Sequence, residues 1–273
     1  MNKPHPLETY IRDRRKTKDI LLMTHIVLGY PDFETSLALV EEMVAAGVDL
    51  MELQIPFSEP MADGPVILAA NQAALDRGTT LAHCLDFSRE VTRKFPIPFL
   101  FMGYANTFYR YGLDRMAQAM AEMDIAGAIV PDFPPEESGV NPGSSQLQSV
   151  LPGQNYLGAM GRHQRAPIHI LTPQTPTARM EFLDRHSQGF IYCTARKGVT
   201  GKATAFSPEL TAYLAQCRET SRLPLAVGFG VRERADIDFL RGKADIAVMG
   251  SETIRVLGDQ GVAGVGKFIK GLN

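Results

Sequence analysis

The strongest constraint on the fold is a series of eight short apolar runs, separated by stretches with helical periodicity. Most of the runs are continuous rather than alternating, so each strand would be buried on both faces, as in parallel sheets. The runs cover residues 20–28, 48–53, 98–102, 128–130, 168–171, 190–194, 225–227 and 246–249. Eight such units in one domain-sized chain favour a closed (β/α)8 barrel over an open doubly wound sheet.

Length and composition fit one barrel of this kind. The chain has 273 residues, of which 45% are hydrophobic and 21% are charged, and its formal net charge is −2. This near-neutral balance, with no basic stripe, argues against nucleic acid as the main partner. We therefore expect a single α/β domain over 1–273, a (β/α)8 TIM barrel with a short extra N-terminal helix at Leu7–Lys16.

The cysteines and the N-terminus indicate a cytoplasmic protein. Cys84, Cys193 and Cys217 are scattered without metal-like spacing, as expected of reduced thiols, and the histidines show no metal spacing either. The N-terminus leads into charged residues rather than an apolar signal core, and no apolar run approaches membrane-spanning length. An organellar protein without its transit peptide would give the same pattern.

One stretch does not fit the barrel pattern. Residues 139–154 are rich in Gly, Pro, Ser and Gln, a composition that disfavours a helix. We expect a surface insertion or disordered loop here, with the helix confined to Tyr156–His163.

Two carboxylates around the second apolar run are candidates for acid–base chemistry. Glu52 lies at the end of this run, and Asp63 lies on the Pro- and Gly-rich stretch that follows. Active sites of (β/α)8 barrels lie at the carboxyl ends of the strands, where a folded-back loop can bring two such groups together. A buried carboxylate costs free energy unless it is paired or used. A structural salt bridge is the alternative for Glu52, and capping of the helix that begins near Pro65 is the alternative for Asp63.

Two glycine-bearing turns indicate a phosphate site. Gly228-Phe229-Gly230 and Gly250-Ser251 follow the seventh and eighth runs, where backbone N–H groups and a helix N-terminus can hold an anion. Ordinary tight turns are the alternative. The loop Arg196–Gly201 could form a lid over the phosphate or be an exposed connection. No Walker or dinucleotide fingerprint is present.

These motifs together resemble the tryptophan synthase alpha subunit family. The most distinctive match is formed by Glu52-Leu53, Ile55–Ser58 and Ala62–Pro65. Further matches follow in order along nearly the whole chain, except 139–154: Gly29–Pro31, Tyr104–Asn106, Asp132–Pro134, Glu136–Ser138, Arg196, Gly198–Gly201, Gly228–Gly230 and Gly250-Ser251.

The resemblance implies a lyase that cleaves indole-3-glycerol phosphate to indole and glyceraldehyde 3-phosphate by a retro-aldol reaction without a cofactor. Glu52 matches the residue that shuttles protons, and Asp63 matches the residue that binds the indole N–H. The other implied roles are substrate binding by Tyr104, Tyr192 and Thr200, and phosphate binding by Gly201, Gly230, Gly250 and Ser251. No metal is implied.

The resemblance also implies a partner, a pyridoxal-phosphate beta subunit that receives indole through a tunnel in an α2β2 heterotetramer. The loops around Pro56–Glu59, Asn106 and Asp132–Pro134 match its docking surface. The chain departs from the family at Gln54, where glycine is usual, and at Glu59, where aspartate is usual. His25 falls near a position at which an aromatic residue contacts the indole.

Three other interpretations remain open: a stand-alone indole-producing lyase, a non-catalytic activator of a beta subunit, and a generic phosphate-binding barrel isomerase. The Glu52 and Asp63 pair argues against the second. The third leaves Asp63 and the proline-rich loop without a purpose.

Overall fold

The computed structural model describes residues 4–140, 155–195, 207–228 and 230–273. Within them, nine parallel strands form one sheet in the order β5-β4-β3-β2-β1-β9-β8-β7-β6. The strands are β1 Leu21–Val27, β2 Leu50–Gln54, β3 Phe99–Met102, β4 Ile125–Ile129, β5 Ala166–Ile168, β6 Ile170–Leu171, β7 Ile191–Thr194, β8 Leu225–Gly228 and β9 Ile246–Met249.

The sheet closes into a barrel at His169. Strands β5 and β6 are the two ends of the strand order, yet only His169 separates them in sequence. Strand β5 pairs with β4, and β6 pairs with β7, so one segment of chain joins both ends of the sheet. The predicted (β/α)8 barrel is therefore confirmed, with the fifth of the eight expected strands divided in two.

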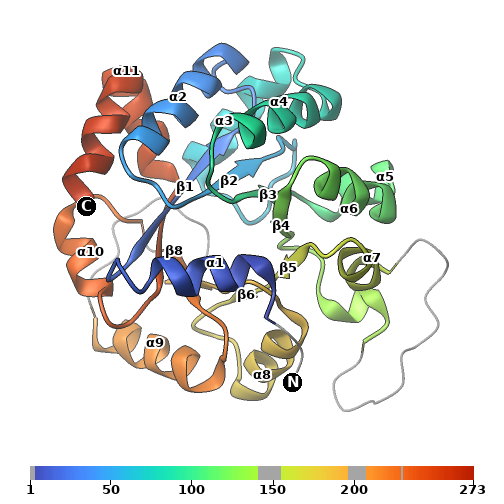
Figure 1. Cartoon of the computed structure of the whole chain (residues 1–273), viewed down its shortest axis with the longest axis vertical. Coiled ribbons are helices and arrows are strands. Elements are labelled where there is room, and N and C mark those ends of the chain that lie inside the picture. Colours follow the sequence, from blue (N-terminus) through green and yellow to red (C-terminus); the bar gives the residue numbers. More distant parts are fainter. Residues whose placement is uncertain (1–3, 141–154, 196–206, 229) are drawn as a thin grey trace.

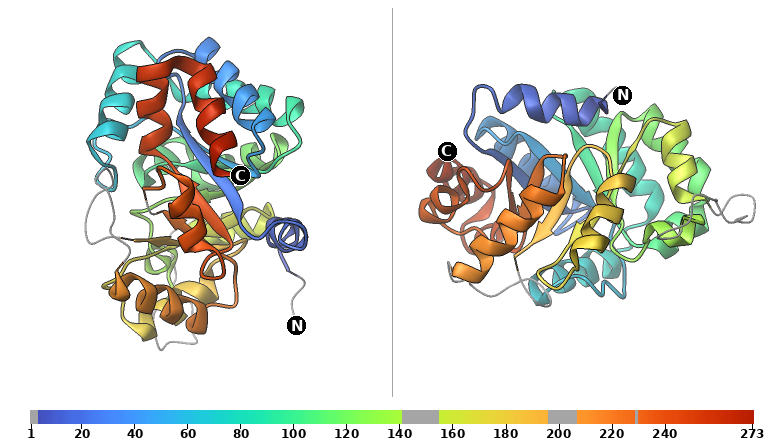
Figure 2. Two further views of the ribbon diagram at one scale, coloured as in Figure 1. Left: turned by 90° about the vertical axis from the view of Figure 1, so that its left-hand side faces the viewer. Right: turned by 90° about the horizontal axis from the view of Figure 1, so that it is seen from below.

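Helices surround the strands, as Figures 1 and 2 show. They are α1 Pro6–Arg14, α2 Phe33–Ala45, α3 Pro65–Asp76, α4 Leu81–Lys94, α5 Ala105–Tyr111, α6 Leu113–Glu122, α7 Tyr156–Arg162, α8 Thr177–His186, α9 Pro208–Thr220, α10 Arg234–Leu240 and α11 Ser251–Leu272, with a short 3-10 helix, η1, at Pro135–Ser138. Most predicted elements lie within a few residues of these bounds. Helix α5 was not predicted from the sequence. Strand β4 begins before the predicted run 128–130, because the small residues Ala126 and Gly127 interrupt the apolar pattern.

Apolar side chains form two layers separated by the sheet. In β1, Met23 belongs to the cluster inside the barrel, whereas its neighbour Leu22 packs with the helices outside. Such alternation follows from the two-residue period of a strand. Burial on both faces explains why the runs are continuous in the sequence. The strand residues of the inner cluster are Leu21, Met23, Leu50, Leu100, Met102, Ile129, Ala166, Ile168, Ala226, Ile246 and Val248.

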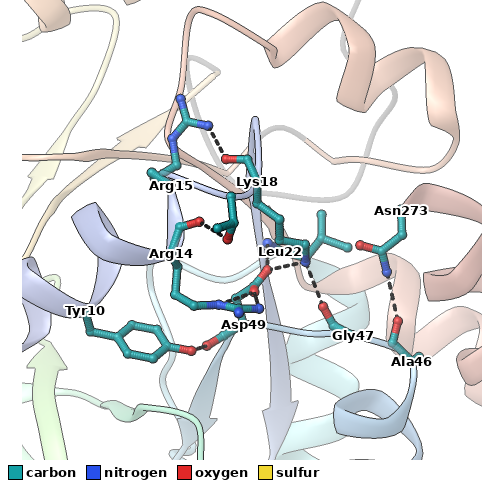
Figure 3. Close-up of polar contacts among 10 residues, drawn as sticks. Tyr10, Arg14, Arg15, Lys18, Leu22, Ala46, Gly47, Asp49 and Asn273 are labelled. Carbon is teal, nitrogen blue, oxygen red and sulfur yellow. Dashed lines mark hydrogen bonds and ion pairs between the residues drawn. The ribbon is translucent and has the colours of Figure 1, made fainter.

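Helix α1 closes the end of the barrel at which the strands begin, which we call the floor (Figures 1 and 2). Asp49, immediately before β2, accepts hydrogen bonds from Arg14 Nη2 at 2.7 Å, Lys18 Nζ at 2.7 Å and the Leu22 backbone N–H at 3.0 Å (Figure 3). The Tyr10 hydroxyl donates to the Asp49 carbonyl oxygen at 3.0 Å. The floor is thus tied together, which leaves the opposite end, the mouth, for a site.

The segment 141–154, which contains most of the expected insertion, lies outside the described residues. The loop Arg196–Gly201, a possible lid, also falls outside them. In the part of the chain that is described, no helix is both long enough and apolar enough to cross a bilayer.

Candidate active site

The register of β1 and β2 places His25 beside Glu52. The two residues are Cα partners in this parallel pair, and both side chains are only 4% exposed. His25 Nδ1 lies 3.0 Å from Glu52 Oε2. The remaining polar atoms of the pair, Glu52 Oε1 and His25 Nε2, are buried and have no hydrogen-bond partner among the described residues. Such atoms are rare in native proteins and often mark sites that bind a ligand or water.

Asp63 lies on the loop between β2 and α3, which folds back towards the end of β2. Asp63 Oδ2 accepts hydrogen bonds from Gln54 Nε2 at 2.6 Å and from the Tyr104 hydroxyl at 3.1 Å. Burial raises the pKa of Asp63, while the Gln54 hydrogen bond, the charge of His25 and the Tyr104 hydrogen bond oppose that rise. Helix α3 is capped by Gly64 without a side-chain hydrogen bond, so Asp63 is not the helix cap.

Tyr104 supports Asp63 from behind. Its hydroxyl also accepts a hydrogen bond from the Ala62 backbone N–H at 3.1 Å, and its ring stacks on Phe57 with the centroids 5.2 Å apart. Burial, followed by the charge of Asp63, raises the pKa of Tyr104, so the phenol stays protonated and donates to the carboxylate. Tyr104 therefore fixes the loop that carries Asp63.

One cavity at the mouth joins these groups to the turns after the last strands. Glu52, Asp63, Tyr192, Gly230, Gly250 and Ser251, all predicted site residues, line it together. Tyr104 is not among the lining residues, and Thr200 and Gly201 lie outside the described residues. The other lining residues are His25, Ala62, Ile67, Met102, Ile129, Pro131, Ile170, Thr194, Ala195, Gly228, Arg232, Val248, Glu252 and Arg255.

The wall between the carboxylates and the glycine turns carries Tyr192, on β7. A Cβ atom on Gly228, in the neighbouring strand β8, would lie 2.6 Å from the Tyr192 hydroxyl oxygen, so glycine makes room for the ring. Burial raises the pKa of Tyr192 well above its usual value, and the charges of Glu52 and Asp63 act in the same direction. Tyr192 therefore presents a neutral phenol and an aromatic face.

The other end of the cavity suits an anion. Gly250 is the N-cap of α11 and Ser251 is its first residue, so free backbone N–H groups and the positive end of a helix lie at this end. The backbone of α11 is non-helical at Gly261, so the helix that begins at Ser251 ends before that residue. Gly230 has a positive φ of 76°, which favours glycine.

Sequence reasoning missed three charged residues at this end of the cavity. Glu252 Oε2 lies 3.4 Å from Arg232 Nε and 2.8 Å from Arg255 Nη1. Their signal was present, since Arg232 follows Gly230 by two positions and Arg255 lies in the first turns after Gly250. The guanidinium groups add to the positive potential expected for a phosphate.

The geometry defines a class of protein. A (β/α)8 barrel with two buried carboxylates at one end of an apolar cavity, and a helix N-terminus with arginines at the other, is a barrel enzyme suited to acid–base chemistry on an apolar substrate with an anionic tail. Among the described residues, no group of histidines, cysteines and carboxylates could hold a metal ion.

Comparison with known proteins gives the particular family. The family profile described as "Tryptophan synthase alpha chain" matches residues 11–266. The alpha chains of Desulforapulum autotrophicum and Syntrophotalea carbinolica are 59% and 55% identical over 266 residues, which cover 97% of this chain and 99% of each relative. A solved structure of Mycobacterium tuberculosis tryptophan synthase superposes with a TM-score of 0.87 at 28% identity, over 99% of this chain and 97% of that one. The chain belongs to the tryptophan synthase alpha chain family.

Family membership decides between the interpretations that the sequence left open. The chain is a carbon–carbon lyase of tryptophan biosynthesis, the alpha subunit that cleaves indole-3-glycerol phosphate. A non-catalytic activator, a stand-alone lyase and a barrel isomerase are not favoured.

Proposed function

We propose that this chain cleaves indole-3-glycerol phosphate with Glu52 as the proton shuttle, Asp63 as the partner of the indole ring and the turns after β8 and β9 as the phosphate site. The observation that carries the proposal is the single cavity that joins both carboxylates to Gly230, Gly250 and Ser251. The substrate has matching parts: an aromatic ring, a hydroxylated side chain and a terminal phosphate.

Glu52 performs both proton transfers of the reaction. Cleavage of the bond between indole C3 and the side chain requires that C3 gain one proton and that the adjacent side-chain hydroxyl lose one as it becomes an aldehyde. Protonated Glu52 gives its proton to C3, and the resulting carboxylate takes the proton of the hydroxyl. Glu52 ends in the state in which it began, so the step is balanced without a cofactor.

Asp63 stabilises the positive charge that develops on the ring when C3 is protonated. Both protein donors, Gln54 and Tyr104, bind its Oδ2 atom. Oδ1 is therefore the oxygen available to accept a hydrogen bond from the indole N–H. A fixed, buried carboxylate stabilises a nearby cation strongly because little water competes with it.

The remaining roles follow the family resemblance. Tyr192 packs against the indole, and Thr200, which lies outside the described residues, corresponds to a residue that interacts with Asp63. The backbone N–H groups of Gly201, Gly230, Gly250 and Ser251 bind the phosphate, and Arg232 and Arg255 add positive charge beside them. The chain itself needs no cofactor.

The partner is a beta subunit that carries pyridoxal phosphate and receives indole, in an α2β2 assembly in the cytoplasm. The loops at Pro56–Glu59, Asn106 and Asp132–Pro134 form its docking surface. Asp132 Oδ1 accepts a hydrogen bond from the Ala105 backbone N–H at 2.8 Å, which ties two of these loops together. Two large apolar side chains close in sequence to these loops, Met61 and Tyr109, are exposed. Such exposure is expected of residues that a partner covers.

Indole release by the purified chain tests the proposal. Glu52→Gln and Asp63→Asn keep the size of each side chain and should each lower turnover by about 10²–10⁴-fold, the usual contribution of a positioned acid–base group. Turnover of Glu52→Gln at the wild-type rate would refute the proton shuttle.

Addition of a beta subunit tests the partner. Its binding should raise the turnover of the wild-type chain, and Glu59→Lys, on the docking surface, should weaken this stimulation without changing the basal rate. High activity with no response to a beta subunit would instead indicate a stand-alone lyase.

A further inference from the structure

His25 is the only protein group that holds Glu52 among the described residues, and it does so at one oxygen. His25 Nδ1 contacts Oε2 at 3.0 Å, while Oε1 has no partner in this part of the chain. The two oxygens of the carboxylate are therefore not equivalent. When the acid proton of Glu52 lies on Oε1, Oε2 accepts a hydrogen bond from a protonated Nδ1 of His25 both before and after that proton is transferred.

The imidazole is carried by a rigid part of the fold. Strand β1 lies between β2 and β9, and the Thr253 hydroxyl donates to the His25 carbonyl oxygen at 3.3 Å and to the Gly250 carbonyl oxygen at 2.6 Å. A Cβ atom on Gly250 would lie 3.8 Å from the Cβ of His25. His25 therefore ties the position of Glu52 to the helix N-terminus at the other end of the cavity.

Glu52 needs such a partner because its chemistry demands a fixed direction. One carboxyl group must reach first indole C3 and then the side-chain hydroxyl, and a free glutamate side chain has several rotamers. A catalytic group that is displaced by about 1 Å can lose about 10²-fold in rate.

We propose that His25 is a positioning residue that holds Oε2 of Glu52 through Nδ1, so that Oε1 is the oxygen that transfers both protons. This inference rests on the proposed role of Glu52. His25 does not exchange a proton with the substrate; its Nδ1–H bond stays intact throughout the reaction.

Three substitutions separate the two ring nitrogens. The amide nitrogen of His25→Asn takes the place of Nδ1, that of His25→Gln takes the place of Nε2, and His25→Phe keeps a ring with neither nitrogen. We expect His25→Phe and His25→Gln to lower kcat by about 10–100-fold with KM changed by less than about threefold, since the position of Glu52 is lost but substrate binding is kept. His25→Asn should restore most of kcat.

A double-mutant cycle supplies a readout that a merely structural role would not produce. If His25 acts only through Glu52, His25→Phe should cause no further loss of turnover in a Glu52→Gln background. Thermal unfolding and the affinity for inorganic phosphate are measured on every variant as controls for folding and for the anion site. If His25→Phe does not fold, the comparison of His25→Asn with His25→Gln still decides the question.

Three results would overturn the inference: a wild-type kcat in His25→Phe, restoration by His25→Gln but not by His25→Asn, or a full additional loss in the Glu52→Gln background. Each leaves the proposed function intact as long as Glu52→Gln itself is inactive. Wild-type turnover in Glu52→Gln would instead refute the proposed function.

Discussion

Asp49 and Glu52 are two buried carboxylates only three positions apart, and they have opposite surroundings. Asp49, at the floor, accepts hydrogen bonds from two cationic side chains and one backbone N–H group. Glu52, at the mouth, has one contact, with His25, and one oxygen without a partner among the described residues. A buried carboxylate whose oxygens all accept hydrogen bonds from the protein stabilises the fold. A buried carboxylate with an oxygen that lacks such a bond costs stability unless a ligand or water binds it.

The difference arises from what each end of the barrel faces. At the floor, helix α1 and the segment after it bring Arg14 and Lys18 across the strand ends, and their heads remain partly exposed to water. At the mouth, Glu52 faces a cavity with apolar walls, among them Ile67, Ile129 and Val248. Long cationic side chains there would fill the space that the substrate needs.

The largest expected effect is on stability at the floor. Asp49→Asn removes the charge that Arg14 and Lys18 share, and hydrogen bonds to charged groups are worth about 1.5–3 kcal/mol each. We expect the free energy of unfolding, measured with urea, to fall by about 2–4 kcal/mol. The matched change Glu52→Gln should leave this free energy unchanged or raise it, because active-site groups often cost stability. Equal losses in both variants would contradict the comparison.

The next effect is at the wall of the cavity. In Gly228→Ala the new methyl group would meet the Tyr192 ring, with Cε1 at 2.8 Å and the hydroxyl oxygen at 2.6 Å, and so displace the ring. Because a small misplacement in an active site is costly, we expect kcat/KM for indole release to fall by about tenfold or more. An unchanged kcat/KM would show that Tyr192 does not contact the substrate.

A smaller effect concerns the pH dependence of stability. The folded-state pKa of Asp63 is raised above its usual value of 3.8, so its contribution to stability is present below pH 3.8 and is lost as the pH rises through the folded-state pKa. Asp63→Asn removes that loss, so the variant should gain stability relative to the wild type as the pH rises above 3.8.

Asp32 provides the control for this experiment, because the backbone N–H of Thr35 lowers its pKa. Its contribution is present above pH 3.8 and is lost as the pH falls through the lowered pKa, so Asp32→Asn should show the opposite trend. The same sign in both variants would contradict the assignment. Unfolding by urea at several pH values measures both.

The smallest effect is expected on the outer surface, away from both ends. Gly258 lies within α11, and a Cβ atom there would have no neighbour within 4 Å in the described structure. Gly258→Ala should stabilise the protein by about 0.5–1 kcal/mol, through helix propensity, and leave indole release unchanged. A loss of activity would indicate that α11 transmits strain to Gly250 and Ser251 at the cavity.

Much of the fold could be predicted from the sequence because the signals are local. The apolar runs, the cap of α2 at Asp32 and the start of α9 after Ser207 are each encoded within a few neighbouring residues. Where local signals are weak, the prediction was wrong or incomplete: small residues hid the start of β4, and the break of the fifth strand at His169 has no sequence signature. Burial lowers the pKa of His169 to about 4, and its Nδ1 lies 2.9 Å from the Ser187 hydroxyl oxygen.

The sequence predicted several of the residues that line the candidate site, but not which of them contact one another. Glu52, near the end of a strand, and Asp63, Gly230, Gly250 and Ser251, after strands, were expected together because the carboxyl ends of parallel strands meet at one end of a barrel. Their roles remain proposals. The charged residues Arg232 and Arg255 were missed because an arginine in a turn or a helix is usually solvated.

The amino-acid sequence by itself determined the barrel and most of its strands and helices, since these depend on the periodicity of burial along one chain. Only the tertiary structure decided which side chain faces which. His25 contacts Glu52 although the two residues are 27 positions apart. Gln54 donates a hydrogen bond to Asp63 because the loop after β2 folds back, and Arg14, at the end of helix α1, donates one to Asp49. Strand register and loop closure set these pairs, because hydrogen bonds and charges act over a few ångströms in space and not over positions in the sequence.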